Sequence, residues 1–503
     1  MKNIKTMKNQ ILIAIVCLAA FASAAYAQGG MAGQTPTSTK GAVIKGKAPV
    51  NKRLLKVTLP RAQEATLKNG LHVVLLESTN KLPIFSMEMV VMSGGLSDPA
   101  DMRGLASITA LQLREGTAKH KSREMAEALD TIGASLTANS GVSSPTSNIS
   151  ASGLTDNLDQ ILDLFAEVIR TPTFPADELE RYKSRTLASL PLLRGQPGFL
   201  AQERLSQAIY GTHPAALVQT PPEVIKKITS ADLAKFHAQN YVPNNATLFI
   251  AGDVTLKNIL PRLEKVFGDW KPGTVTPATI PAVPAQGETK IHLINRPGSV
   301  QTVFQIGSLG LERTDPDYVA LTVMNRILGQ GPSARLFLNI REDKGYTYSV
   351  GSSFSAGKYR GTFTAQSPVR TEVTEGTIRE FMNEFKRIRD EKVSPAELQN
   401  AKNAIIGGFA LTLENPAGRL NNLITLKLYN FPANYWDTYP QKVEAITAED
   451  IQRVAMKYVD INHMQIVAVG DASKTREVLA KFGSVQEYDG DGKPMRTASA
   501  GGQ

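Results

Sequence analysis

Cysteine is almost absent from this sequence. Among 503 residues the only cysteine is Cys17. This excludes a disulfide framework, and beyond the first residues it excludes a cysteine-based zinc site and a cysteine nucleophile. Long apolar runs are also missing: apart from one segment at the start, none reaches the ~20 residues that span a bilayer. We therefore expect no stable membrane insertion.

A cluster of charges of one sign is missing as well. The formal net charge is +10, but Lys and Arg are scattered among Asp and Glu, and no basic run is interleaved with aromatic residues. This pattern disfavours a nucleic-acid partner. The composition, 42% hydrophobic and 20% charged, is typical of a globular protein. At this length at least two core-bearing units are expected.

The first 27 residues have the pattern of a signal peptide. Lys2, Lys5 and Lys8 precede an apolar stretch at 11–22, and a small-x-small site ends at Ala27. The sequence thus predicts export to the bacterial periplasm with cleavage after Ala27. Residues 28–57, rich in Gly, Thr, Lys and Pro, are expected to be a flexible lead-in.

The rest of the chain is a tandem repeat. The stretch at 228–232 (Ile-Thr-Ser-Ala-Asp) matches the stretch at 446–450 (Ile-Thr-Ala-Glu-Asp), and each leads through an amphipathic helix to an apolar strand that ends in Gly-Asp. The near-constant offset indicates two homologous halves. We place these at 58–270 and 288–485, with a Pro-rich linker at 271–287 and a flexible tail at 486–503.

Each half mixes strand and helix patterns. Residues 71–76 and 85–91 are predicted strands, 124–132 and 156–170 are predicted helices, and 134–152 resembles a hairpin at a sheet edge. The predicted fold is α+β, with antiparallel sheets packed with helices in each half.

Recognisable catalytic motifs are absent. The chain has six histidines, and no two of them fall within one helical face, so a helical His/Glu zinc site is missing. A glycine-rich stretch at 329–334 imitates a dinucleotide fingerprint. It lies between two predicted helices and is interpreted as a turn.

A frame of residues in the first half nevertheless resembles a known family. This frame is Gly-Leu-Ala at 104–106, a five-residue stretch at 107–111, four further residues and Gly-Thr at 116–117. The same spacing occurs in the pitrilysin-like zinc metallopeptidases, which include insulinase and mitochondrial processing peptidase, and this chain resembles them. The similarity covers about residues 60–485. It implies a clamshell of two homologous halves.

The residues of the family's zinc site are replaced in this frame. The family reads His-x-x-Glu-His at 107–111, where this chain has Ser107 and Leu111 in place of the ligands and Ala110 in place of the general base. The third ligand, a glutamate, would fall at Ala188 or Ser189. Leu and Ala offer no ligand atom and a neutral Ser hydroxyl is a poor one, so no metal or other cofactor is expected in this chain.

The second half keeps another part of the family pattern. Zinc peptidases of this family use an Arg and a Tyr seven residues apart, which Arg341 and Tyr348 match. We expect a helix at 333–343, a stop at Gly345 and a strand at 346–350. Arg and Tyr can both donate hydrogen bonds to a peptide oxyanion. Alternatively, Arg341 pairs with Glu342 and Tyr348 only packs. Tyr346 would share a strand face with Tyr348, so which tyrosine acts stays open.

The resemblance implies a role within a pair of chains. In two-chain members one subunit carries zinc and the other carries the Arg/Tyr pair. We therefore expect a non-catalytic partner subunit of a periplasmic zinc metallopeptidase, bound to a homologous zinc-bearing subunit and enclosing unfolded peptides. The alternative is a scaffolding protein derived from a peptidase. A self-sufficient peptidase is disfavoured because no residue could activate water.

Overall fold

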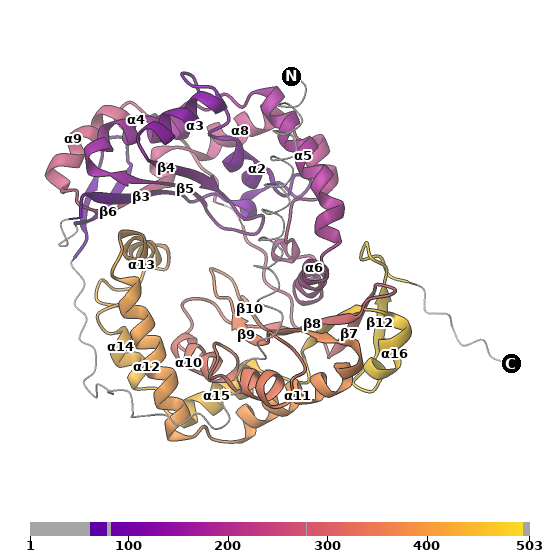
Figure 1. The fold of residues 1–503 in the computed structure, drawn as a ribbon. Coiled ribbons are helices and arrows are strands. Elements are labelled where there is room, and N and C mark those ends of the chain that lie inside the picture. The colour runs from indigo at the N-terminus through magenta and orange to yellow at the C-terminus, as the bar shows by residue number, and fades with distance from the viewer. Residues whose placement is uncertain (1–60, 78–81, 278, 496–503) are drawn as a thin grey trace, which may run out of the picture. The chain divides into compact units, whose positions relative to one another are not determined.

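The computed structural model describes residues 61–77, 82–277 and 279–495, which form two six-stranded sheets packed with helices (Figure 1). The predicted signal peptide at 1–27 and the predicted lead-in at 28–57 lie outside this range. Within it, no helix has both the length and the apolar character that a bilayer crossing requires.

The first half contains the elements from β1 to α9. Its strands are β1 (Gln63–Thr66), β2 (His72–Glu77), β3 (Ile84–Val91), β4 (Ser135–Asn139), β5 (Ser147–Leu154) and β6 (Ala246–Gly252). Its helices are α2 (Leu105–Gln112), α3 (Ser122–Thr131), α4 (Leu158–Arg170), α5 (Ala176–Arg194), α6 (Pro197–Tyr210), α7 (Pro222–Lys227), α8 (Ser230–Asn240) and α9 (Leu256–Phe267).

The second half repeats this order from β7 to α16, except that its edge strand, β12, comes last in the chain whereas β1 comes first. Its strands are β7 (Lys290–Asn295), β8 (Gln301–Leu309), β9 (Gly351–Phe354), β10 (Thr362–Arg370), β11 (Gln465–Gly470) and β12 (Val485–Tyr488). Its helices are α10 (Tyr318–Leu328), the π-helix η5 (Phe337–Asp343), α11 (Thr374–Asp390), α12 (Pro395–Thr412), α13 (Pro416–Leu428), α14 (Tyr439–Glu444), α15 (Ala448–Tyr458) and α16 (Ala472–Ala480).

The two sheets have the same strand order, β1-β2-β6-β3-β5-β4 and β12-β7-β11-β8-β10-β9. This confirms the predicted α+β class with two homologous halves. The pairing is more mixed than predicted: β6 runs parallel to β2, β11 runs parallel to β7, and β12 also pairs with β7 in parallel. A hairpin can join only antiparallel strands. Long helical connections precede β6 and β11, so β6 can run parallel to β2 and β11 can run parallel to β7.

Successive side chains of a strand point to opposite faces of the sheet, and this alternation explains why a layer of helices packs on the apolar face. Along β3, Phe85, Met87 and Met89 are buried against the helices of the first half, including Ile161 and Phe165 of α4. Figure 1 shows α4 and α9 along this face of the sheet. The stretch predicted as a hairpin forms β4 and β5, and β4 is the edge strand, as expected.

The predicted flexible tail at 486–503 is wrong for residues 486–488. Residues 486–488 belong to β12, which pairs with β7, and the Tyr488 side chain is buried. Its hydroxyl lies 3.0 Å from Nδ1 of His292. The stretch is short and is followed by Gly and Asp, so the sequence favoured a loop; long-range pairing with β7 makes it a strand.

The predicted linker contains neither helix nor strand in its described part, 271–277 and 279–287. One of its side chains contacts the second sheet: the Leu309 amide donates a hydrogen bond to Oε1 of Gln286 (2.8 Å).

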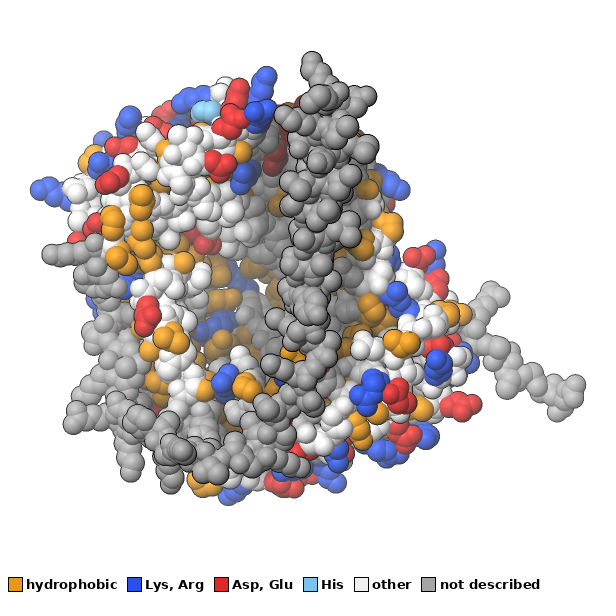
Figure 2. Space-filling view, viewed as in Figure 1, with side chains coloured by type: hydrophobic (Ala, Val, Ile, Leu, Met, Phe, Trp, Pro, Cys, Tyr) orange, Lys and Arg blue, Asp and Glu red, His pale blue; other side chains and the backbone are white. Residues whose placement is uncertain are grey.

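Charges of both signs are interspersed over the face of the molecule seen in Figure 2. Many charged side chains form surface ion pairs, such as Arg379 with Glu375 and Lys392 with Glu449, both at 2.7 Å. Such pairs contribute little to stability individually.

Candidate active-site remnant and the Arg341–Tyr348 pair

Helix α2 carries the degenerate zinc motif. Gly104 precedes it with φ of +107°, and a Cβ there would lie 2.2 Å from Oγ1 of Thr220, so glycine is required. The buried carboxylate of Asp98 accepts hydrogen bonds from the amides of Gly104 (2.7 Å) and Ala106 (2.9 Å). Burial raises the pKa of Asp98 to about 7, although these bonds and the charge of Arg103 oppose the rise.

The three motif positions have different environments on this helix. Ser107 is half-buried, Ala110 is fully buried and Leu111 is exposed. On α5, the Ala188 and Ser189 side chains are exposed, and Ser189 Oγ donates to the carbonyl of Thr186 (2.8 Å). The helices that hold the zinc motif are therefore present, but their side chains do not fit a zinc ion.

No group of three or more His, Cys, Asp or Glu residues suited to a metal ion occurs in the part of the chain that the structure describes. One smaller cluster lies just after the family frame. His120 Nδ1 lies 2.9 Å from Oε1 of the buried Glu167, and the Thr117 hydroxyl donates to the same carboxylate. These contacts connect the turn after α2 to α4, so the cluster has a structural role.

Arg341 lies in η5 and is positioned by the turn that ends it. Gly345 has φ of +63°, which suits glycine. Its amide donates to the Arg341 carbonyl (3.1 Å), and the Tyr346 amide donates to the Ile340 carbonyl (3.0 Å). The chain therefore reverses directly after η5, as the sequence predicted.

The structure brings the two predicted residues together. The guanidinium carbon of Arg341 lies 4.6 Å from the centre of the Tyr348 ring and 4.5 Å from the centre of the Phe337 ring. Arg341 is also 3.6 Å from the carboxylate of Glu342, which was the alternative interpretation. Phe337 was not among the predicted site residues, although its position one helical turn before Arg341 is the signal that could have found it.

The predicted strand at 346–350 is wrong. Residues 346–350 are irregular, and β9 begins only at Gly351. The Thr347 hydroxyl donates to the carbonyls of Ser349 (3.0 Å) and Pro368, and Arg370 donates to the Gly345 carbonyl (3.2 Å). Because side chains make hydrogen bonds to these backbone groups, the segment does not need to pair with a neighbouring strand.

The two tyrosines consequently do not share a face. Tyr346 is half-buried against the core of the second half, and a Cβ on Gly376 would lie 2.9 Å from its ring. Tyr348 is 83% exposed, and its ring lies over Arg341. By geometry, Tyr348 rather than Tyr346 is the tyrosine that could contact a bound molecule together with Arg341.

An ion pair between the buried Arg335 and the half-buried Glu397 fixes the residues before η5. Arg335 binds the Glu397 carboxylate on α12 through Nε (2.8 Å) and Nη2 (3.1 Å). These bonds from Arg335, together with those from Ser394, lower the pKa of Glu397 to about 2 against the opposing effect of burial. A bidentate pair of this kind restrains the segment that presents Arg341.

The arrangement offers two hydrogen-bond donors of different kinds. Arg341 presents a planar guanidinium that contacts the rings of Phe337 and Tyr348, and the exposed Tyr348 presents a phenol. Such donors suit a carbonyl oxygen that becomes negatively charged. They could stabilise such an oxygen, whereas neither they nor Ser107, Ala110 and Leu111 on α2 could activate water.

Comparisons with protein families agree with the frame described above. A family model described as Insulinase (Peptidase family M16) matches residues 73–220. A second model, described as Peptidase M16 inactive domain, matches residues 227–405.

Individual relatives cover most of the chain. An uncharacterized zinc protease, YmxG of Bacillus subtilis, is 25% identical over 361 residues, 71% of this chain and 85% of its own. A non-peptidase homolog, also named YmxG, of Helicobacter pylori is 23% identical over 407 residues, 80% of this chain and 93% of its own. The crystal structure of a peptidase M16 inactive domain from Pseudomonas fluorescens has 30% identity and a TM-score of 0.76, covering 82% of this chain and 98% of its own.

Proposed function

This chain belongs to the peptidase M16 family, and we propose that it is the non-catalytic partner subunit of a zinc metallopeptidase of that family. One observation carries the proposal. The motif positions on α2 and α5 have lost every zinc ligand and the general base, whereas Arg341 and Tyr348 remain in contact at 4.6 Å. A protein that had lost all role in catalysis would have no need of this exposed pair.

The zinc ion and the activated water belong to the partner in this proposal. A homologous subunit that retains His-x-x-Glu-His would supply both, and this chain would supply hydrogen bonds to the oxygen of the scissile peptide. Zinc lowers the pKa of a bound water and thereby generates a nucleophile at neutral pH. Arg341 and Tyr348 would hold and polarise the substrate carbonyl.

The substrate class is an unfolded peptide. The donors of Arg341 and Tyr348 fit a backbone carbonyl, which every peptide has, and they do not select a particular side chain. The N-terminal signal pattern at 1–27 favours the bacterial periplasm as the place of action.

The test uses the mature chain, beginning at Gln28, co-expressed with an M16 relative from the same genome that retains the zinc motif. We expect a complex near twice the mature mass, with about one zinc that stays with the partner, and peptide hydrolysis far above that of either chain alone. The control is a partner whose motif glutamate is replaced by glutamine, because it should assemble but not cleave.

Two results would contradict the proposal. One is that both folded chains elute separately at micromolar concentration. The other is that the dialysed chain alone retains about one tightly bound zinc. Assembly without any gain in hydrolysis would instead support the alternative of a scaffolding protein derived from a peptidase, in which Tyr348 and Phe337 only pack against Arg341.

A further inference from the structure

We propose that an uncharged trough beside α6 binds an extended peptide segment and favours segments without charged side chains. The trough consists of two adjoining cavities of about 460 and 350 Å³ on the second sheet, and Gln305 and Gln366 line both of them. Helix α6 packs on β8 and β11 and forms one bank of the trough, and Figure 1 shows this helix lying along the sheet. The inference rests on the proposed function and deepens it, because it concerns the peptide that Arg341 and Tyr348 would hold.

The lining of the trough contains no charged residue. Because 20% of the residues of the chain are charged, this absence is a property of the place and not of the composition. The polar side chains of the lining carry hydroxyls and amides, and all of them are half-buried or exposed. Examples are Gln202 and Ser206 of α6, Gln305 of β8, Ser353 of β9, and Thr364 and Gln366 of β10.

These side chains have hydrogen-bonding capacity to spare. Gln305 Nε2 donates to Gln366 Oε1 (3.3 Å), and the hydroxyls of Ser353 and Thr364 are 3.0 Å apart. A glutamine amide has two donor hydrogens and an oxygen with two lone pairs, and a hydroxyl can both donate and accept. Among the described residues the two amides make no other side-chain hydrogen bond, so one hydrogen of Gln305 and both hydrogens of Gln366 are available to a ligand.

The polar side chains along β10 repeat at the interval of an extended peptide. Thr362, Thr364 and Gln366 line the trough, whereas Phe363 and Ala365 between them are buried in the core. Side chains two residues apart on a strand lie about 6.8 Å apart, and this is also the two-residue repeat of an extended peptide. Successive backbone groups of a bound peptide can therefore meet equivalent groups of the wall. This match favours a peptide over a saccharide.

The trough begins where the Arg341–Tyr348 pair ends. Ser349 and Val350 directly follow Tyr348 in the chain, and both line the first of the two cavities. A peptide whose carbonyl oxygen contacts Tyr348 could thus place its neighbouring residues in the trough.

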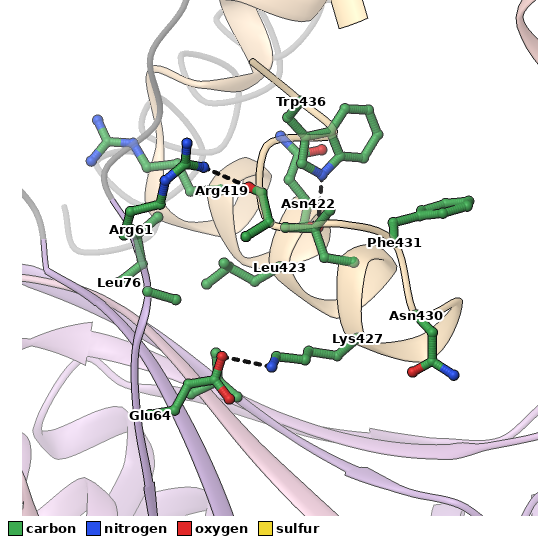
Figure 3. A pocket seen from close by; sticks show the side chains of 14 residues that line it. Arg61, Glu64, Leu76, Arg419, Asn422, Leu423, Lys427, Asn430, Phe431 and Trp436 are labelled. Atoms are coloured by element: carbon green, nitrogen blue, oxygen red, sulfur yellow. Dashed lines mark hydrogen bonds and ion pairs between the residues drawn. The ribbon is translucent and has the colours of Figure 1, made fainter. Parts of the chain in front are cut away.

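The first half carries charge at the corresponding places. Glu88 occupies the position in β3, between β5 and β6, that Gln305 occupies in β8, between β10 and β11. The cavity between α13 and the first sheet is lined by four charged residues, among them Lys427 and Glu64, which pair at 2.6 Å (Figure 3). The uncharged lining therefore distinguishes the trough beside α6 from the cavity beside α13.

An uncharged lining discriminates through the charges that it lacks. A charged side chain that enters the trough gives up part of its hydration and finds no opposite charge. Neutral side chains meet hydroxyls, amides and the apolar side chains of Leu205 and Ile209. The proposal thus predicts weaker binding for either sign of charge. Attraction by the positive net charge of the protein would instead favour acidic peptides.

The mature chain alone provides the test, so neither a partner subunit nor cleavage is needed. The probe is a ten-residue, end-capped peptide of Ser, Thr, Gln, Ala and Leu with a neutral coumarin at one end. Two further peptides have three central residues replaced by Lys or by Glu. Fluorescence anisotropy at about 0.15 M salt measures the three affinities. We expect saturable binding of the neutral peptide and at least tenfold weaker binding of both charged peptides.

The matched variants are Gln305→Glu and Gln399→Glu. The first gives the trough the carboxylate that Glu88 carries in the first half, so it should bind the lysine peptide about tenfold more tightly than the wild type does and should bind the glutamate peptide more weakly. Gln399 is exposed on α12 and lies outside the trough lining, so the same change there should alter none of the three affinities. A purely structural role of Gln305 would weaken all three peptides alike.

Three results would overturn the proposal. These are equal affinities for the neutral and charged peptides, an unchanged order of affinities in Gln305→Glu, and displacement of the neutral peptide by maltotriose, which would indicate a saccharide site. Absence of peptide binding by a chain that still forms an active complex would refute the trough alone. Failure to assemble with a zinc-bearing partner would refute the proposed function and leave the peptide preference of the trough standing.

Discussion

The two halves of the molecule keep one architecture with different chemistry. Their sheets share a strand order, and in each half a buried aspartate lies between the long central strand and the helix that follows it. In the first half Asp98 accepts hydrogen bonds from the backbone amides of Gly104 and Ala106, whereas in the second half Asp317 binds the side chains of Arg453 (2.6 Å) and Lys457 (2.8 Å). The apolar pattern thus maintains the fold, while the polar residues at equivalent places are free to diverge.

The two halves also differ at the positions that match the family's active-site motifs. On α2, Ala110 replaces the family's general base and is fully buried, so this site has become part of the core. In the second half, Arg341 keeps a solvent-facing tyrosine as its neighbour. In this structure the second half therefore keeps exposed polar groups at its site, whereas α2 packs into the core.

The largest expected effect comes from Tyr348→Phe in the complex with a zinc-bearing partner. The change removes one hydroxyl and keeps the ring over Arg341, so loss of one oxyanion donor should lower kcat about 10²–10³-fold with little change in KM. Arg341→Lys should also be impaired, because lysine keeps the charge but loses the planar group that contacts Phe337 and Tyr348. The measurement is steady-state hydrolysis at equal complex concentration.

Tyr346→Phe is the internal control for this pair. The Tyr346 ring packs against the core of the second half, so removing its hydroxyl should lower kcat less than removing the Tyr348 hydroxyl. Wild-type rates in the Tyr348→Phe and Arg341→Lys complexes would make the pair structural and favour the scaffold alternative.

The two aspartates should give opposite pH dependences of stability. Burial raises the pKa of Asp98 to about 7, so its contribution to the free energy of unfolding is fully present below its ordinary pKa of ~3.9 and is lost as pH rises toward 7. Between pH values below ~3.9 and above about 7, the contribution of Asp98 to the free energy of unfolding changes by up to about 4 kcal/mol. For Asp317, burial is outweighed by hydrogen bonds from Lys457 and Arg453, so its pKa is lowered. Its stabilisation is present above the ordinary pKa and is lost as pH falls below it.

Melting temperatures of Asp98→Asn and Asp317→Asn from pH 3 to pH 8 measure this difference. Relative to Asp98→Asn, the wild type should lose stability between pH 4 and pH 7. Relative to Asp317→Asn, it should gain stability as pH rises from 3. Parallel curves for the wild type and Asp98→Asn would show that the carboxyl of Asp98 ionises normally.

Restoring the family's glutamate should test whether α2 is now a packing element. Ala110→Glu places an unpaired carboxyl where the side chain is fully buried, so we expect a loss of about 3 kcal/mol in the free energy of unfolding. Leu111→His, at a position that is 41% exposed, should change stability by no more than about 0.5 kcal/mol. Denaturant titration of both variants is the measurement, and similar values for the two would contradict the packing interpretation.

The sequence predicted the repeat, the α+β class, the hairpin of β4 and β5 and the helix α4, because each has a local period or a long-range match. It misplaced the segment at 346–350, because a Tyr-Thr-Tyr pattern cannot show that Thr347 and Arg370 satisfy the backbone. It also missed the strand β12, which depends on pairing with β7.

The contact of Arg341 with Tyr348 was expected only through a family pattern, and residue spacing alone left the structural alternative open. The cavity beside α13 could not be predicted at all. It depends on how side chains from β1, β2 and α13 pack together across a long separation in sequence, and no local pattern reports the space they leave.

The smallest expected effect concerns the reversal that brings Tyr348 over Arg341. Gly345 has φ of +63° and open space where a Cβ would be, so Gly345→Ala should destabilise the protein only by the cost of a left-handed conformation, about 1 kcal/mol. Gly407 is exposed within α12 and also has open space, so Gly407→Ala should instead stabilise by about 0.5–1 kcal/mol. Thermal unfolding of both variants gives the sign of each effect. Because relief of strain at Gly345 would open the turn, Gly345→Ala should also lower kcat of the complex, while Gly407→Ala should not. Equal stabilisation by both substitutions would mean that the turn after η5 does not require its left-handed residue.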